Sequence, residues 1–176
     1  MTIPSSNPMI RGGRRDRVVQ EYRHDTYKSR GKLKEPTACS QCGAVFHKGR
    51  WTWGAKPLQA HTATCPACER MNDHYPAGVL SLRGPFIKAH NAEILGLARN
   101  EEAQAKAEHP LSRIMGIDEE DDTIVISTTD THLPRRIGEA LHHAYHGELN
   151  LRYSKDQQFI RVLWVRDHEP EKGALR

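Results

Sequence analysis

Two pairs of cysteines are the feature that most constrains how this chain can fold. They are Cys39-x-x-Cys42 and Cys65-x-x-Cys68, twenty-two residues separate them, and they account for all four cysteines of the 176-residue chain. A two-residue spacing lets one tight turn present two sulfurs to a tetrahedral ion at about 2.3 Å, and a second turn completes the shell. Gly43 follows the first pair and permits such a turn. We therefore expect one Zn²⁺ held by these four cysteines, in preference to two disulfides or free thiols.

The expected ion is structural, because a shell closed by four thiolates leaves no open position for a substrate. Residues 39–82 contain few apolar side chains for a core of their own. Metal binding, with a free energy of about 10–16 kcal/mol, can stabilise the segment in place of an apolar core. His47 and His61 lie between the cysteine pairs and could replace a thiolate. With four cysteines present, they fit better as surface or RNA-contacting groups.

Charge is distributed unevenly along the chain. The net charge is +4, but residues 1–34 carry nine basic and three acidic side chains, a local charge of +6, so the remaining residues sum to −2. Residues 1–38 show neither helical nor strand periodicity, which predicts an extended basic arm. Such an arm is typical of tails that bind nucleic acid, and a solvated leader is the alternative. Its candidate phosphate contacts are Arg11, Arg14, Arg15 and Arg17.

The segment between the cysteine pairs interleaves basic and aromatic residues. Lys48 and Arg50 could contact phosphates while Trp51 or Trp53 stacks on a base. The competing interpretation is that the tryptophans cover the zinc site as a small core, and we expect this of one of them.

The rest of the chain predicts an α+β arrangement with short elements. Strands are expected over 79–82, 123–127, 148–153 and 159–166, helices over 86–108 and from Leu133 onward, and a solvated acidic turn over 118–122. These elements suggest a small sheet with helices on one face. The expected organisation is an extended basic arm (1–38), a four-cysteine zinc ribbon (39–85), a connecting helix (86–110) and a β-α-β-β module (111–170).

The helix from Leu133 offers a second candidate contact surface. Arg135 and Arg136 lie on its polar side, where they could bind nucleic acid. His142, His143 and His146 lie on or near the same surface, and local helix pairing of His142 and His143 beside Glu139 is the alternative.

Enzyme signatures are poor in this sequence. It contains no H-E-x-x-H, no G-x-x-x-x-G-K-[ST] and no G-x-S-x-G. A zinc deaminase would need H-x-E upstream of P-C-x-x-C, whereas the H-x-E of this chain begins at His146 and Thr64 precedes Cys65. We therefore expect no enzymatic activity and no small-molecule substrate.

Apolar runs in the chain fall short of the roughly 18 residues of a membrane span, and the N-terminus lacks the apolar stretch of a secretory signal. We expect a cytoplasmic protein that does not contact membranes.

Four segments carry a resemblance to known proteins. They are Cys39-Ser-Gln-Cys42-Gly-Ala-Val-Phe-His-Lys-Gly-Arg-Trp, Cys65-Pro-Ala-Cys68-Glu-Arg, Tyr75-Pro-Ala-Gly78 and His132-Leu-Pro-Arg-Arg-Ile-Gly-Glu-Ala-Leu141. Together they resemble a bacterial family of small zinc-ribbon proteins of largely unassigned function. More distantly, the C-x-x-C-G ribbon followed by a β-α-β-β module is similar to the N-terminal half of the archaeal and eukaryotic adaptor that binds the large ribosomal subunit. Since that adaptor is expected to have more cysteine pairs, only the four cysteines are carried over.

The distant resemblance implies binding to rRNA or the ribosome through the ribbon and the basic surface. The sequence therefore predicts an RNA-binding zinc-ribbon protein that associates with the ribosome as a translation, hibernation or assembly factor. One alternative is a zinc-ribbon DNA-binding or transcription-associated protein, which the lack of a helix-turn-helix pattern disfavours. The other is an adaptor that binds protein through its sheet.

Overall fold

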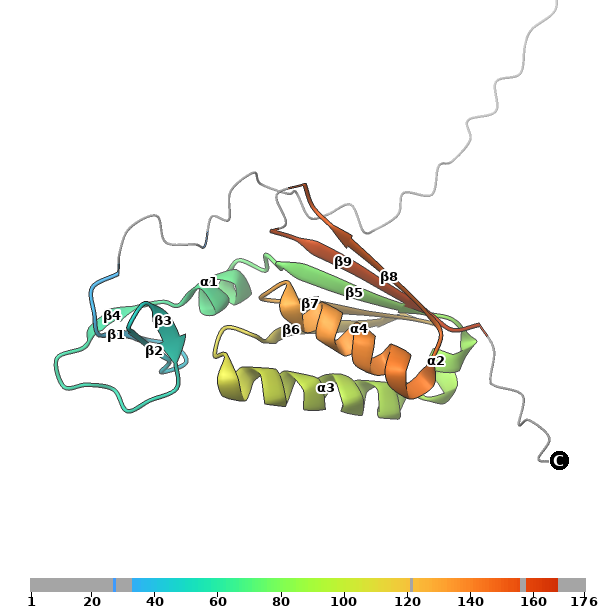
Figure 1. The fold of residues 1–176 in the computed structure, drawn as a ribbon, viewed down its shortest axis with the longest axis horizontal. Coiled ribbons are helices and arrows are strands. Elements are labelled where there is room, and N and C mark those ends of the chain that lie inside the picture. The colour runs from blue at the N-terminus through green and yellow to red at the C-terminus, as the bar shows by residue number, and fades with distance from the viewer. Residues whose placement is uncertain (1–26, 28–32, 121, 156–157, 168–176) are drawn as a thin grey trace, which may run out of the picture.

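A computed structural model of the chain describes residues 27, 33–120, 122–155 and 158–167. Two sheets lie side by side, a small one within residues 37–63 and a larger one within residues 78–165 (Figure 1). The mixture of helices and strands confirms the predicted α+β class. Most of the predicted arm lies outside the described residues, including Arg11, Arg14, Arg15 and Arg17. None of the described helices is long and apolar enough to cross a bilayer.

The smaller sheet corresponds to the predicted ribbon. Its strands are β1 (Thr37–Cys39), β2 (Val45–His47), β3 (Arg50–Thr52) and β4 (His61–Ala63), in the order β3-β2-β1-β4. β1 pairs antiparallel with β2 and parallel with β4, while β2 and β3 form a hairpin. Each strand has only three residues, so the sheet buries few side chains and needs another source of stability. Helix α1 (Pro66–Asn72) begins directly after Cys65.

The larger sheet has five strands and is described below as the module. Its elements are β5 (Gly78–Arg83), α2 (Pro85–Ala89), α3 (Asn91–Glu108), β6 (Ile114–Glu120), β7 (Thr123–Thr128), α4 (His132–Tyr145), β8 (Glu148–Tyr153) and β9 (Ile160–Val165). The strand order is β6-β7-β5-β9-β8, with β5 and β9 parallel and the other neighbours antiparallel. β5 and β6 run in the same direction with β7 between them, which is a split β-α-β arrangement.

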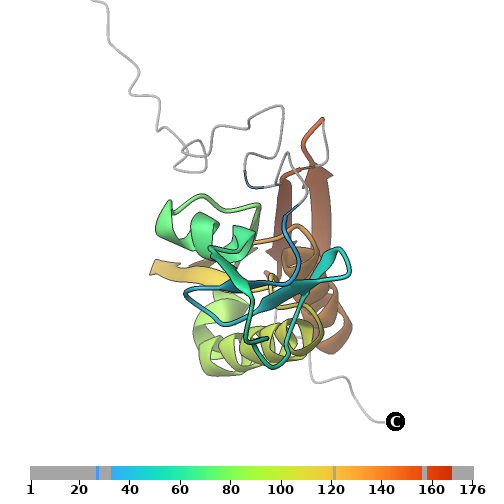
Figure 2. The same cartoon turned by 90° about the vertical axis from the view of Figure 1, so that its left-hand side faces the viewer.

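The core of the module lies between one face of this sheet and the helices. Alternate residues of the central strands are fully buried, as period-two patterning requires. They are Leu80, Leu82, Ile124, Ile126, Ile160, Val162 and Trp164. α3 and α4 lie side by side against this face (Figure 1). Figure 2, which looks at the molecule from the ribbon end, shows the ribbon in front of the module.

Helix α4 illustrates how local sequence forms one of these elements. Leu133, Ile137 and Leu141 recur at helical spacing and are fully buried against the sheet. Asp130 Oδ1 accepts hydrogen bonds from the backbone N–H groups of His132 and Leu133, at 3.1 and 2.8 Å, and so caps the first turn.

Three expectations from the sequence are corrected here. β5 belongs to the middle of the module sheet, between β7 and β9, although residues 39–85 were all expected in the ribbon. The predicted single helix over 86–108 is interrupted at His90, and its two parts pack on the module core instead of only connecting two domains. The acidic residues Asp118 to Glu120 form the end of strand β6. An edge strand tolerates exposed charges, because only one of its sides pairs with a neighbour.

Candidate metal centre

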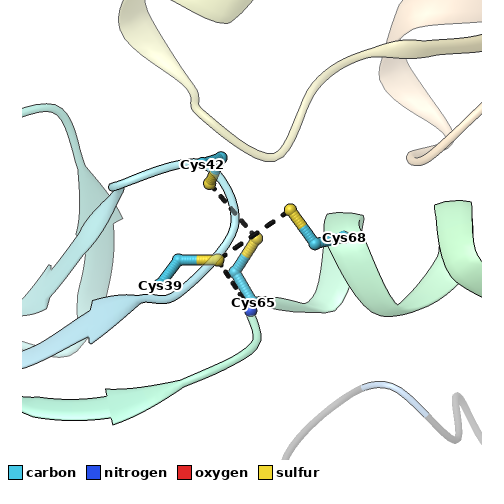
Figure 3. Close-up of side chains that lie close together, drawn as sticks. All are labelled: Cys39, Cys42, Cys65 and Cys68. Atoms are coloured by element: carbon cyan, nitrogen blue, oxygen red, sulfur yellow. Dashed lines mark hydrogen bonds between the residues drawn. The ribbon is translucent and has the colours of Figure 1, made fainter.

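The four cysteines converge on one point, as Figure 3 shows. Their sulfur atoms all lie within 4.8 Å of one another, and Cys39 to Cys68 and Cys42 to Cys65 are both 3.8 Å apart. A tetrahedral ion with metal–sulfur distances of about 2.3 Å requires sulfur–sulfur distances of about 3.8 Å. Disulfide-bonded sulfurs would be about 2.0 Å apart. The cysteines therefore form a candidate structural metal site, and the donor set fits Zn²⁺.

Local backbone geometry positions each sulfur. Cys39 ends β1, and the turn after it is closed by a hydrogen bond from the Gly43 N–H to the Cys39 carbonyl at 3.1 Å. Gly43 has a φ of +76°, a conformation that glycine adopts without strain. Cys65 precedes α1 and Cys68 lies in its first turn. The turn after β1 therefore positions the sulfurs of Cys39 and Cys42, and the start of α1 positions those of Cys65 and Cys68.

Burial and backbone donors act in opposite directions on these thiols. Burial raises the pKa of Cys39, but N–H groups of Cys42, Cys65 and Gln41 stabilise its thiolate more strongly and lower the pKa to about 6. The Cys65 N–H lies 3.3 Å from the Cys39 sulfur. Burial instead raises the pKa of Cys65 and Cys68. Compared with Cys65 and Cys68, Cys39 therefore has surroundings that favour the thiolate form, which is the form that binds metal ions.

A small apolar shell surrounds the site. Ala44 and Ala67 are buried against the cysteines, and Trp51 and Leu111 pack onto them. The Trp51 ring also contacts Phe46, with ring centroids 5.5 Å apart. Trp51 is thus the tryptophan that covers the site, as expected for one of the two.

Arg113 is a neighbour of the site that the sequence did not suggest. It is 7% exposed and its Nη1 lies 3.5 Å from the Cys68 sulfur. Burial works against its charge, but hydrogen bonds and charge interactions with Cys42 and Cys68 outweigh this and raise its pKa. Arg113 lies forty-five positions after Cys68 in the chain, so no spacing pattern could have predicted their contact.

Trp53 occupies a different position from Trp51. Its side chain is 41% exposed, and its Nε1–H donates to the Lys106 carbonyl oxygen at 2.6 Å. That carbonyl lies in the last turn of α3, where helix carbonyls lack intrahelical partners. Trp53 therefore joins the ribbon to the module.

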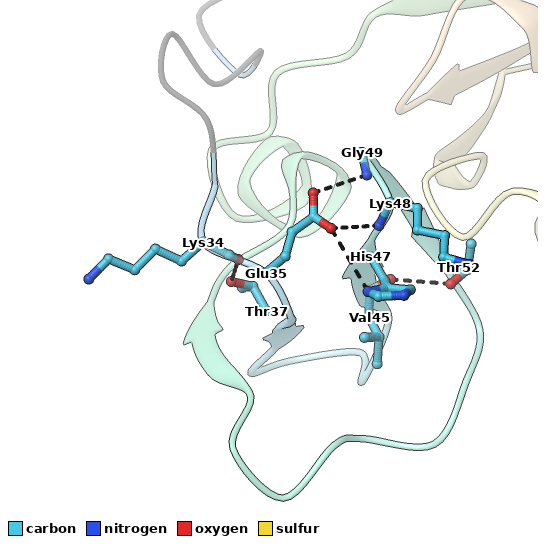
Figure 4. A network of polar contacts seen from close by, with 8 residues as sticks. All are labelled: Lys34, Glu35, Thr37, Val45, His47, Lys48, Gly49 and Thr52. Carbon is cyan, nitrogen blue, oxygen red and sulfur yellow. Dashed lines mark hydrogen bonds and ion pairs between the residues drawn. The ribbon is translucent and has the colours of Figure 1, made fainter.

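The other predicted ribbon contacts lie at the tip of the β2–β3 hairpin. Lys48 and Arg50 are exposed there. The Glu35 carboxylate accepts hydrogen bonds from the Lys48 and Gly49 N–H groups at 2.7 and 3.1 Å (Figure 4). His47 is exposed, with its Nδ1 3.8 Å from Glu35. The metal cluster found among the described residues contains four cysteines and neither His47 nor His61.

Arg135 and Arg136 lie near the start of α4. Arg135 forms an ion pair with Glu139 at 2.7 Å. Arg136 binds Glu101 at 2.5 Å and also contacts Gln104 on α3.

Comparison with family models, curated proteins and solved structures finds no match to this chain.

Proposed function

We propose that this chain is a zinc-ribbon protein that binds RNA and associates with the ribosome, where it acts as a translation, hibernation or assembly factor. The observation that carries the proposal is that the start of the ribbon, to which the basic arm is joined, is tied to the basic tip of the β2–β3 hairpin. The ribosome as the target rests on the sequence resemblance described above.

Glu35 makes this connection. Its carboxylate holds the hairpin turn through two backbone N–H groups, so the neighbouring Lys34 lies beside that turn. The Lys34 side chain extends away from the hairpin (Figure 4) and, like Lys48 and Arg50, it is exposed. Lys48 and Arg50 lie on the β2–β3 hairpin, and Glu35 joins to its turn the end of the segment 1–34, which includes Lys34 and carries a local charge of +6.

A surface of this kind suits phosphates better than base edges. Lysine and arginine on a turn can follow a phosphate backbone without reading its sequence. Trp51 is committed to the metal site, so stacking on a base falls to the partly exposed Trp53. Binding should accordingly be strong at low salt and only weakly dependent on RNA sequence.

The test is the salt dependence of binding to ribosomal RNA by the variant K34A/K48A/R50A. If each side chain contacts one phosphate, the magnitude of the slope of log K against log salt falls by about 2 to 3. At about 0.1 M salt this corresponds to a loss of affinity of roughly 100- to 500-fold. A variant with an unchanged slope would contradict the proposed surface.

The matched control removes three exposed charges from the rest of the chain. Lys88, Arg99 and Lys155 are exposed and belong to α2, α3 and the β8–β9 connection. K88A/R99A/K155A has the same net charge as the ribbon variant, so equal effects of the two triple substitutions would point to overall charge and not to a surface.

Co-sedimentation with ribosomal subunits in a sucrose gradient tests the target. We expect the wild-type chain to sediment with a subunit at low salt and K34A/K48A/R50A to stay near the top. A wild-type chain that binds duplex DNA and not ribosomes would favour the transcription-associated alternative. Binding to neither nucleic acid would favour the protein adaptor.

A further inference from the structure

A buried cation lies where the ribbon meets the module. Arg113 directly precedes β6 and is 7% exposed. Its Nε–H donates to the Pro110 carbonyl oxygen at 2.7 Å and its Nη1–H to the Cys68 sulfur at 3.5 Å. Its Nη2 is also buried and has no hydrogen-bond partner among the described residues. A buried guanidinium requires a nearby negative charge.

The metal centre can supply that charge. Four thiolates around a divalent cation leave two negative charges in excess, and arginine keeps its positive charge at all ordinary pH values. We propose that Arg113 is the counter-charge of the metal–thiolate centre and that metal binding thereby holds the ribbon against the module.

The backbone of the module presents Arg113 rigidly. The Arg113 N–H donates to the Thr129 hydroxyl at 2.9 Å, and that hydroxyl donates to the Leu111 carbonyl at 2.5 Å. The Thr129 N–H returns a hydrogen bond to the Arg113 carbonyl at 3.0 Å. Because Thr129 directly follows β7, the segment that carries Arg113 is attached to the module sheet.

Three further contacts cross the same boundary. Leu111 packs against the cysteine cluster. Trp53 donates to Lys106 at 2.6 Å, and the Arg113 guanidinium carbon lies 5.9 Å from the centre of its ring. Leu111, Lys106 and Arg113 belong to the module, whereas Trp53 and the cysteines belong to the ribbon. The metal centre is therefore the charged part of an interface between the two sheets.

The experiment observes this interface through the indole N–H groups of Trp53 and Trp164. The Trp53 N–H is bonded across the interface, whereas the Trp164 N–H donates to His146 at 2.7 Å inside the module. Hydrogen exchange at both is followed by nuclear magnetic resonance in zinc-loaded and chelator-stripped protein. We expect stripping to accelerate exchange at Trp53 at least tenfold and to leave Trp164 unchanged. Slow exchange at Trp53 in stripped protein would overturn the proposal.

Substitution of Arg113 separates charge from simple packing. Arg113→Met should speed zinc transfer to a competing chelator by about 10- to 100-fold, the usual effect of removing a residue that supports metal ligands. It should also accelerate exchange at Trp53. Arg113→Lys, which keeps the positive charge, should release zinc more slowly than Arg113→Met. The matched control is Arg99→Met on the exposed side of α3, which should change neither quantity.

Protection of Trp164 shows whether each variant is folded. If Trp164 loses its protection in Arg113→Met, that variant is unfolded and the proposal is tested with Arg113→Lys instead. A lysine variant that releases zinc near the wild-type rate supports the proposal. Wild-type zinc release and Trp53 exchange in Arg113→Met would overturn it. So would a lysine variant that keeps Trp164 protected but loses zinc tenfold faster than the wild type.

Discussion

Replacing Cys65 by serine should separate the stability of the ribbon from that of the module. Cys65 is fully buried, and its sulfur lies 3.8 Å from that of Cys42. Without this sulfur the shell has three thiolates, so zinc content should fall from one ion per chain to nearly none. The ribbon has three-residue strands, and its buried apolar side chains besides the cysteines are small: Ala38, Ala44, Val45 and Ala67. It should therefore lose its structure with the metal.

The effect on the module should be small. Its core contains fifteen buried residues from β5, β7, β9 and the helices, and none of them comes from the ribbon. The interface then loses the Trp53 hydrogen bond to Lys106, which contributes about 0.5–1.5 kcal/mol, and the contact between Arg113 and the metal centre. Unfolding of the ribbon would expose the Arg113 guanidinium to water, so its charge would not remain buried without a partner. For a domain of this size, 1 kcal/mol corresponds to a change in melting temperature of about 4–8 °C.

Two measurements report on the two parts. Elemental analysis gives the zinc content, and thermal melting followed by far-ultraviolet circular dichroism reports mainly on α3 and α4, the longest helices described. Ser40→Ala is the control, since Ser40 is exposed between the first two cysteines and should leave both values unchanged. A Cys65→Ser protein that keeps one zinc, or one whose module no longer melts cooperatively, would refute the reasoning.

Three further substitutions test the packing and the arm. Gly78→Ala should destabilise the module by about 1–3 kcal/mol, because a new Cβ would lie 2.6 Å from the Pro134 ring. Gly96→Ala on α3, where a new Cβ would have nothing within 4 Å, should stabilise the module by about 0.5–1 kcal/mol. Urea unfolding measures the stability of both variants, and equal effects of the two substitutions would contradict the predicted clash at Gly78. Burial and the hydrogen bond to Asp73 raise the pKa of Tyr27 to about 12, so its contribution to stability should be intact below about pH 10 and lost as pH rises through 12. The difference in tyrosinate absorbance between the wild type and Tyr27→Phe, measured against pH, follows the ionisation of Tyr27. Ionisation near pH 10 would show that Tyr27 is not bound to Asp73 in solution.

Some features of this protein could be predicted from the sequence because they depend on residues close together in the chain. Each cysteine pair is positioned by one turn or by the first turn of one helix, so its spacing alone indicated a metal site. The buried face of α4 likewise follows from apolar residues recurring along one helix, capped by Asp130. Local geometry and periodicity are set within a few residues, and the sequence records them directly.

Other features were decided only by tertiary structure. β5 reads as a short apolar strand whether it lies in a ribbon or in the centre of a sheet, and its parallel pairing with β9 joins segments about eighty residues apart. Trp51 and Trp53 look equivalent in the sequence, but one packs on the metal site and the other bonds to α3. Arg113 contacts Cys68 only because the α3–β6 connection passes the ribbon. Such contacts depend on how distant elements pack together, and no pattern of neighbouring residues encodes that choice.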